Sequence, residues 1–116
     1  MDIIYLKDFC IKTKVGIYAW EQAITQLISL DIEIGAEINV AAETDNITDT
    51  LNYASLAESL HLFITTNTFK LIETLAIQVA DYIHEQFKVS WIKLKVNKIG
   101  AIPNAKEVGV IIERQY

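Results

Sequence analysis

The apolar residues of this chain recur with a period of two at both ends and with a helical period in the middle. Alternating apolar residues occupy about residues 2–15, 26–36, 91–98 and 108–113, whereas residues 53–66 and 69–87 carry them three and four positions apart. Alternation is typical of half-buried strands, and spacings of three and four are typical of amphipathic helices. The predicted order is therefore strand, strand, helix, helix, strand, strand.

The first strand is predicted to be bent. Its apolar positions change parity near Lys7 and Asp8, as they do across a β-bulge. Gly16 ends this strand, and the segment IYAWEQ is expected to form a turn or a short helix. The later polar segment NVAAETDNITDT is rich in turn-forming residues and is predicted to be a connection within one domain.

Two amphipathic helices are predicted between the strand pairs. Asn67 or Thr68 is expected to cap the second of them. The apolar stripe of the first helix consists of Tyr53, Leu56, Ala57, Leu60 and Ile64. The stripe of the second consists of Leu71, Ile72, Leu75, Ala76, Val79, Ala80, Ile83 and Phe87.

These elements predict an α+β fold of order ββααββ, with a four-stranded antiparallel sheet and both helices on one face. Residues 1–116 are predicted to be a single domain, because a chain with 52% hydrophobic and 22% charged residues can bury a real core. The uncovered face of the sheet and its long free edges predict closure by oligomerisation.

Charge and composition exclude several classes of partner. A net charge of −5 and a pI near 4.9 argue against nucleic acid. Four lysines cluster near the third strand, and we expect them to face a lumen or a small anion: Lys93, Lys95, Lys98 and Lys106. No stretch approaches ~18 uninterrupted apolar residues, so no membrane partner is predicted. The single cysteine and the acidic start MDIIYLKDF predict a cytoplasmic protein.

The sequence lacks the motifs of metal and nucleotide sites. His61 and His84 lie on different predicted helices without HExxH spacing, and Cys10 has no second cysteine, so no zinc site is predicted. The segment KIGAIPNA lacks the glycine spacing of a phosphate loop, and no serine lies in a GxSxG elbow. The remaining acids, tyrosines and Lys98 favour proton transfer without a cofactor.

Lys98 falls in the apolar register of its strand. In WIKLKVNKIG, the residues Ile92, Leu94 and Val96 alternate with polar ones, and Lys98 continues the apolar set. One interpretation is that the strand ends at Asn97 and the lysine reaches water. The other is a desolvated lysine that serves as a base or a proton shuttle. The strand alone leaves both open.

Three further polar residues each have a purely structural explanation. Glu73 points away from its helix stripe and is by default a solvated side chain. Glu21 suits the first turn of a short helix, where the helix dipole favours an acid. Tyr53 fits a core aromatic whose hydroxyl lies at the rim.

Five segments of the chain follow one another in a distinctive order, and they are spread over most of its length, from Val15 to Arg114. They are VGIYAWEQ, TDTLNYASLAE, FKLIETLA, VNKIGAI and VGVIIER. Together they resemble the dihydroneopterin aldolase family of the folate pathway. The resemblance implies the tunnelling fold, in which four ββααββ subunits join their sheets into a barrel and two such rings stack into a homo-octamer. It also implies pterin sites between adjacent subunits.

The resemblance implies a reaction and a role for each residue. The reaction is a retro-aldol cleavage of 7,8-dihydroneopterin into 6-hydroxymethyl-7,8-dihydropterin and glycolaldehyde, without metal, cofactor or Schiff base. Glu73, aided by the backbone of Ile72, is implied to bind the guanidine-like edge of the pterin, and Glu21 to lie near the polar tail of the substrate. Tyr53 is implied to bind the substrate and exchange a proton with the intermediate. Lys98 is implied to handle the hydroxyl proton through water.

One position departs from the family pattern. Ile99 replaces the proline that usually follows the lysine, and the only proline is Pro103, so the path of the loop is less constrained. Dihydroneopterin triphosphate epimerases also lack that proline and are an alternative, as is a non-catalytic pterin-binding oligomer. The segments YAWEQ and VGVIIER favour the aldolase. Such an aldolase is also expected to epimerise the side chain, which gives dihydromonapterin.

Overall fold

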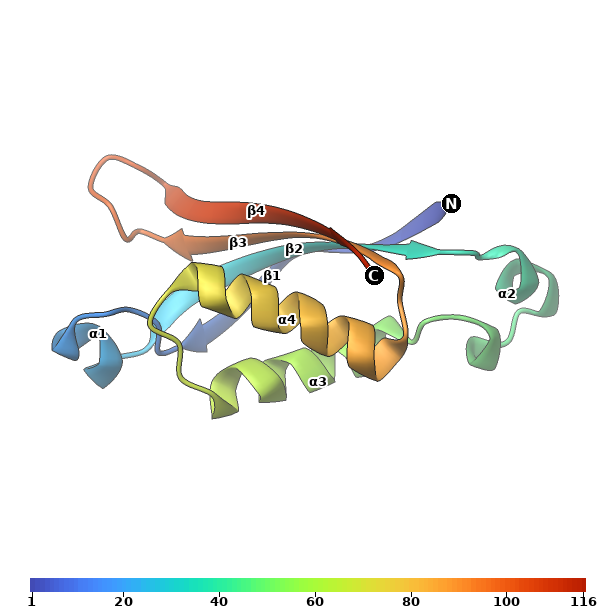
Figure 1. Cartoon of the computed structure of the whole chain (residues 1–116), viewed down its shortest axis with the longest axis horizontal. Helices are drawn as coiled ribbons and strands as arrows, with labels where there is room; N and C mark the ends of the chain where they lie inside the picture. Colours follow the sequence, from blue (N-terminus) through green and yellow to red (C-terminus); the bar gives the residue numbers. More distant parts are fainter.

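The strands pair in the order in which they occur along the chain. The computed structural model describes residues 1–116 and contains one sheet of order β1-β2-β3-β4, with every pairing antiparallel (Figure 1). The strands are β1 (Asp2–Thr13), β2 (Gln26–Ala36), β3 (Trp91–Ile99) and β4 (Glu107–Gln115). The long helices are α3 (Tyr53–Thr66) and α4 (Ile72–Phe87). The predicted ββααββ order is confirmed.

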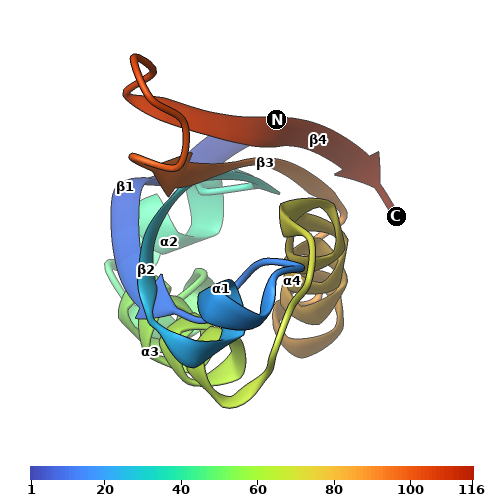
Figure 2. The same cartoon turned by 90° about the vertical axis from the view of Figure 1, so that its left-hand side faces the viewer.

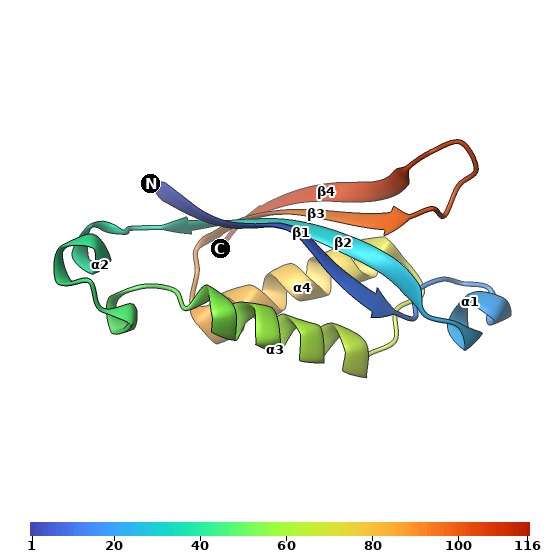
Figure 3. The ribbon, with the colours of Figure 1, turned by 180° about the vertical axis from the view of Figure 1, so that it is seen from behind.

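Both long helices cover the same face of the sheet (Figures 1 and 3). The alternating apolar residues of β2 and β3 point toward the helices and are fully buried, and they pack with the helix stripes in one core of 19 residues. Those from the two strands are Ile28, Leu30, Ile32, Ile34, Ile92, Leu94 and Val96. The helices contribute Leu56, Leu60, Ile64, Leu75, Ala76, Val79, Ala80 and Ile83.

The predicted bulge in β1 is present. The register with β2 shifts between Leu6 and Phe9, and Asp8 has a positive φ of 53°. The hydroxyl of Ser29 donates to the Asp8 carboxylate at 2.6 Å. This hydrogen bond is the main reason that the pKa of Asp8 lies below its usual range.

Several boundaries differ from the sequence prediction. α4 begins at Ile72 rather than 69, and its N-cap is Leu71 rather than Asn67 or Thr68. Phe69 instead forms an isolated bridge with Val15, which holds this stretch extended. Leu71 is exposed and is not part of the buried stripe of α4. The polar connection also contains two short elements, α2 (Asn39–Thr44) and the 3-10 turn η1 (Ile47–Asp49).

Tyr53 does not belong to the core as its helix stripe predicted. It is the first residue of α3, and 60% of its surface is exposed. The first turn of a helix can extend past the layer that its later turns cover. Leu56, one turn further on, is fully buried.

The lysines of β3 do not form one cluster. Lys93 and Lys95 lie on the uncovered face, and in the register with β2 they stand opposite Glu33 and Asp31. Lys98 has the opposite parity and lies on the helix side with the apolar residues. The predicted common surface is therefore wrong for Lys98. None of the helices combines the length and apolar character that a membrane crossing requires.

Candidate active site

Lys98 forms an ion pair with Glu21 at one end of the sheet. β3 continues to Ile99, and Lys98 lies between Ile28 and Val108 in the register of the neighbouring strands. Its Nζ is 2.8 Å from Oε2 of Glu21, and the two side chains are only 15% and 8% exposed. The strand therefore does not end at Asn97, and Lys98 does not simply reach into water.

Glu21 is held by the short helix α1 (Ala19–Ala23), which lies at the same end of the molecule (Figure 2). Its Oε1 accepts the backbone N–H of Tyr18 at 3.3 Å, and its Oε2 accepts the amide of Gln26 at 3.4 Å in addition to the lysine. Both carboxylate oxygens are thus oriented by donors, so the carboxylate has one fixed position beside the ammonium.

The hydrogen bond from Lys98 is the largest influence on Glu21 and lowers the pKa of that carboxyl, although burial opposes the shift. The carboxylate is therefore charged at neutral pH. A folded-state pKa below the unfolded value means that the pair stabilises the fold at neutral pH. This contribution is lost as the pH falls through the lowered pKa.

Gly16 allows the Glu21 carboxylate to occupy this position. Its φ is +148°, and a Cβ at this position would collide with the Glu21 side chain. Any larger residue would therefore push the carboxylate away from Lys98. From the sequence, Gly16 was predicted only to end a strand. No local pattern could show that a residue five positions later returns to contact it.

Ile72 and Glu73 form the first turn of α4, and Glu73 is exposed as predicted. The first N–H groups of a helix have no partner within the helix, so this turn offers backbone donors beside a carboxylate. It lies at the same end as α1: the N–H of Gly16 donates to the carbonyl of Phe69, just before α4, at 3.1 Å (Figure 2). Glu21, Lys98, Ile72 and Glu73 therefore share one end of the subunit.

Tyr53 lies at the other end. α3 begins on the side of α2, away from α1 (Figures 1 and 3). A cavity there is lined by Asn52 and Ser55 and by the last residues of β2 from Ile34 on. Ile34 is six residues along β2 from Ile28, the register partner of Lys98, which corresponds to ~20 Å of strand. One subunit therefore does not bring Tyr53 to the ion pair.

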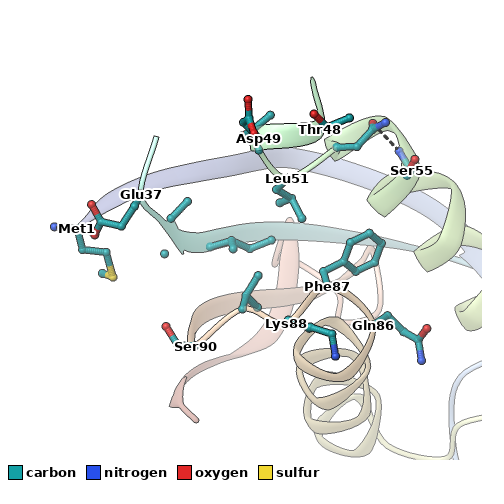
Figure 4. Close-up of a pocket in the computed structure, with 16 residues that line it drawn as sticks. Met1, Glu37, Thr48, Asp49, Leu51, Ser55, Gln86, Phe87, Lys88 and Ser90 are labelled. Carbon is teal, nitrogen blue, oxygen red and sulfur yellow. Dashed lines mark hydrogen bonds and ion pairs between the residues drawn. The ribbon is translucent and has the colours of Figure 1, made fainter. Parts of the chain in front are cut away.

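The cavity near Tyr53 is open and has a volume of about 880 Å³ (Figure 4). The end of β2, the residues before α3 and the end of α4 form its walls. Thr48, Asp49 and Ser55 lie on one side of it, and Gln86, Lys88 and Ser90 lie on the other. The cavity includes neither Lys98 nor the acids at the opposite end. No three His, Cys, Asp or Glu side chains in the chain lie close enough to hold a metal ion.

The chain is similar to dihydroneopterin aldolases by family model, by sequence and by structure. The dihydroneopterin aldolase family model matches residues 4–113. The dihydroneopterin aldolase of Escherichia coli strain K12 is 38% identical over 98% of this chain and 93% of its own. A dihydroneopterin aldolase structure from Vibrio cholerae has a TM-score of 0.98 at 37% identity and covers 100% of this chain and 98% of its own. The Escherichia coli enzyme in complex with neopterin has a TM-score of 0.95 at 38% identity, with 98% and 99% covered.

Proposed function

This chain belongs to the dihydroneopterin aldolase family, and we propose that it uses the Glu21–Lys98 pair to cleave the side chain of 7,8-dihydroneopterin. As a member it is a carbon-carbon lyase of folate biosynthesis. The products of the proposed reaction are 6-hydroxymethyl-7,8-dihydropterin and glycolaldehyde. The observation that supports the assignment of the residues is the buried ion pair, because it brings a proton donor and an acceptor together at the end of the subunit where α4 begins.

The pterin ring is assigned to the first turn of α4. The guanidine-like edge of a pterin presents parallel N–H donors, and a carboxylate such as that of Glu73 accepts such an edge in a bidentate way. The N–H of Ile72, free of any partner within the helix, is a donor for the carbonyl of the ring. In this position the polar side chain of the substrate extends toward Glu21 and Lys98.

We assign to the ion pair the transfer of the proton from the hydroxyl group of the substrate. The reaction breaks the bond between the first and second carbons of the side chain. The second carbon becomes the aldehyde as its hydroxyl loses a proton, and the electron pair moves to the first carbon and into the imine of the dihydropterin. A hydroxyl or water that contacts both Lys98 and Glu21 from the side meets a donor and an acceptor together, which is the arrangement that moves this proton.

We assign to Tyr53 the donation of the proton that the first carbon receives after the bond is broken. A phenol can donate this proton and recover it from solvent, and the ring of Tyr53 is exposed rather than packed. Because Tyr53 lies at the far end of its own subunit, the site must combine it with the ion pair of a neighbour. This supports pterin sites shared between adjacent subunits.

The edges of the sheet support a closed assembly. β1 and β4 each pair on one side only, and unpaired edges invite pairing with another copy. Light scattering is therefore expected to give a closed multiple of four subunits, with the octamer of two stacked rings at about 105 kDa for chains of 13.1 kDa. A stable, active monomer would contradict the shared site.

Replacing Glu73 by glutamine is expected to lower the affinity for neopterin at least ~10-fold, about 1.4 kcal/mol. The amide loses the charge-assisted pair and presents a donor to donors. Calorimetry measures the change. Glu85→Gln on the exposed side of the same helix is the matched control and should bind normally. Normal folding with unchanged affinity in Glu73→Gln would remove its assigned role.

The activity itself is tested by incubating the purified protein with 7,8-dihydroneopterin and measuring glycolaldehyde. Release of glycolaldehyde is the expected result, and binding without release would favour the non-catalytic oligomer. Formation of dihydromonapterin in the same reaction would establish the side-chain epimerase activity that we also propose. A large preference for the triphosphate would favour the epimerase alternative.

We also propose that residues 1–116 act as one catalytic domain in the cytoplasm. The single core of 19 buried residues supports the first point, because it contains residues of both helices and of β1, β2 and β3. The single free cysteine, Cys10, supports the second, because reducing compartments keep thiols unpaired.

A further inference from the structure

Gln22 connects the two segments that carry the proposed site. Its amide donates to the carbonyl of Gly16 and, at 3.2 Å, to the carbonyl of Phe69. The N–H of Gly16 donates to the same Phe69 carbonyl at 3.1 Å. One carbonyl therefore accepts two donors from the segment around α1, and Gln22 closes this connection through its side chain.

This connection adds to the few other side-chain contacts of α1, chiefly those of Glu21 with Lys98 and Gln26. The helix is five residues long, and Glu21 is its only buried residue. On the other side, Phe69 is itself buried and lies three residues before Ile72. The contacts of Gln22 therefore join a weakly packed helix that carries Glu21 to a firmly packed point beside the first turn of α4.

We propose that Gln22 is a positioning residue that sets the separation between the Glu21–Lys98 pair and the pterin-binding turn at Glu73. The inference rests on the proposed function, since the substrate is taken to span both points. Without the amide, α1 keeps its backbone contacts but loses two side-chain donors. The ring then still binds at Glu73, while the polar tail no longer meets the ion pair in the reactive geometry.

The test compares two ligands that differ in the tail. Neopterin carries the full side chain, whereas 6-hydroxymethylpterin keeps the ring and loses most of the tail. In Gln22→Met, which keeps the length but removes the donors, the ratio of the two affinities is expected to shift at least ~5-fold against neopterin. Turnover of 7,8-dihydroneopterin is expected to fall ~10-fold or more, because small displacements of a reacting group are costly.

Two further variants make the result specific. Gln22→Asn is a smaller change, because it keeps the amide and only shortens its reach. It is expected to show the same selective loss of affinity for neopterin. Gln78→Met makes the same chemical change at an exposed position on α4 and should leave both the affinities and the turnover unchanged.

Equal loss of affinity for the two ligands in both Gln22 variants would overturn the inference, because a general structural defect does not distinguish the tail from the ring. Affinities and turnover within twofold of wild type would overturn it as well. If the wild-type protein itself binds neither pterin, the proposed function fails, and the inference fails with it. That outcome is recognised in the unmodified protein, before any variant is measured.

Discussion

Lys98→Met is expected to lower the turnover of 7,8-dihydroneopterin by roughly 10²- to 10⁴-fold. Methionine keeps the apolar stem of the side chain but removes the nitrogen that contacts Glu21 at 2.8 Å. The measurement is steady-state release of glycolaldehyde. Lys93→Met is the matched control, since Lys93 lies on the same strand but is exposed on the uncovered face, and it should retain full turnover.

The same substitution is also expected to lower the temperature of unfolding at neutral pH. If Lys98 were buried without a partner, its replacement would raise the temperature of unfolding, since it would delete an unpaired buried charge. The structure shows that the charge is paired, so methionine would leave the Glu21 carboxylate buried without its main partner. Glu21→Gln in the same chain should recover part of the lost stability without recovering turnover. Wild-type turnover in a folded Lys98→Met protein would leave the lysine with a structural role only.

Tyr53→Phe is expected to lower turnover by ~10²-fold while pterin binding is retained. Phenylalanine keeps the ring but has no proton to exchange with the intermediate. Calorimetry with neopterin and the glycolaldehyde assay separate the two effects. Tyr18→Phe is the control variant, because it removes the hydroxyl of another exposed tyrosine near the site. A Tyr53→Phe protein at full rate would exclude the proton-transfer role.

Mixing the two inactive variants gives a sharper test of the shared site. If Lys98 and Tyr53 act from different subunits, oligomers assembled from equal amounts of Lys98→Met and Tyr53→Phe chains contain about a quarter of sites with both native residues, as expected for random assembly around a heterologous interface. Activity should then return to about a quarter of wild type. No recovery in mixed oligomers of confirmed composition would place both residues in one subunit, against the ~20 Å of strand between them.

The elements that the sequence predicted well are those in which buried residues recur at a regular, short spacing along the chain. In β2 and β3 the buried apolar residues alternate along the strand, and in α3 and α4 the buried residues recur every three or four, so local spacing is enough to reveal them. The bulge near Asp8 was visible for the same reason, as a change of parity. The start of α4 was not, because a bridge between Phe69 and the distant Val15 keeps the chain extended there.

The candidate residues themselves were recognised by the resemblance of five segments to a known family, and the apolar register singled out Lys98. By itself, the sequence thus determined the order of the elements and most of their buried faces, and it proposed Glu21, Tyr53, Glu73 and Lys98 as candidate site residues. Only the tertiary structure decided that Lys98 is paired with a residue 77 positions away and that Tyr53 lies at the opposite end. Both depend on contacts between distant segments, which no local periodicity encodes.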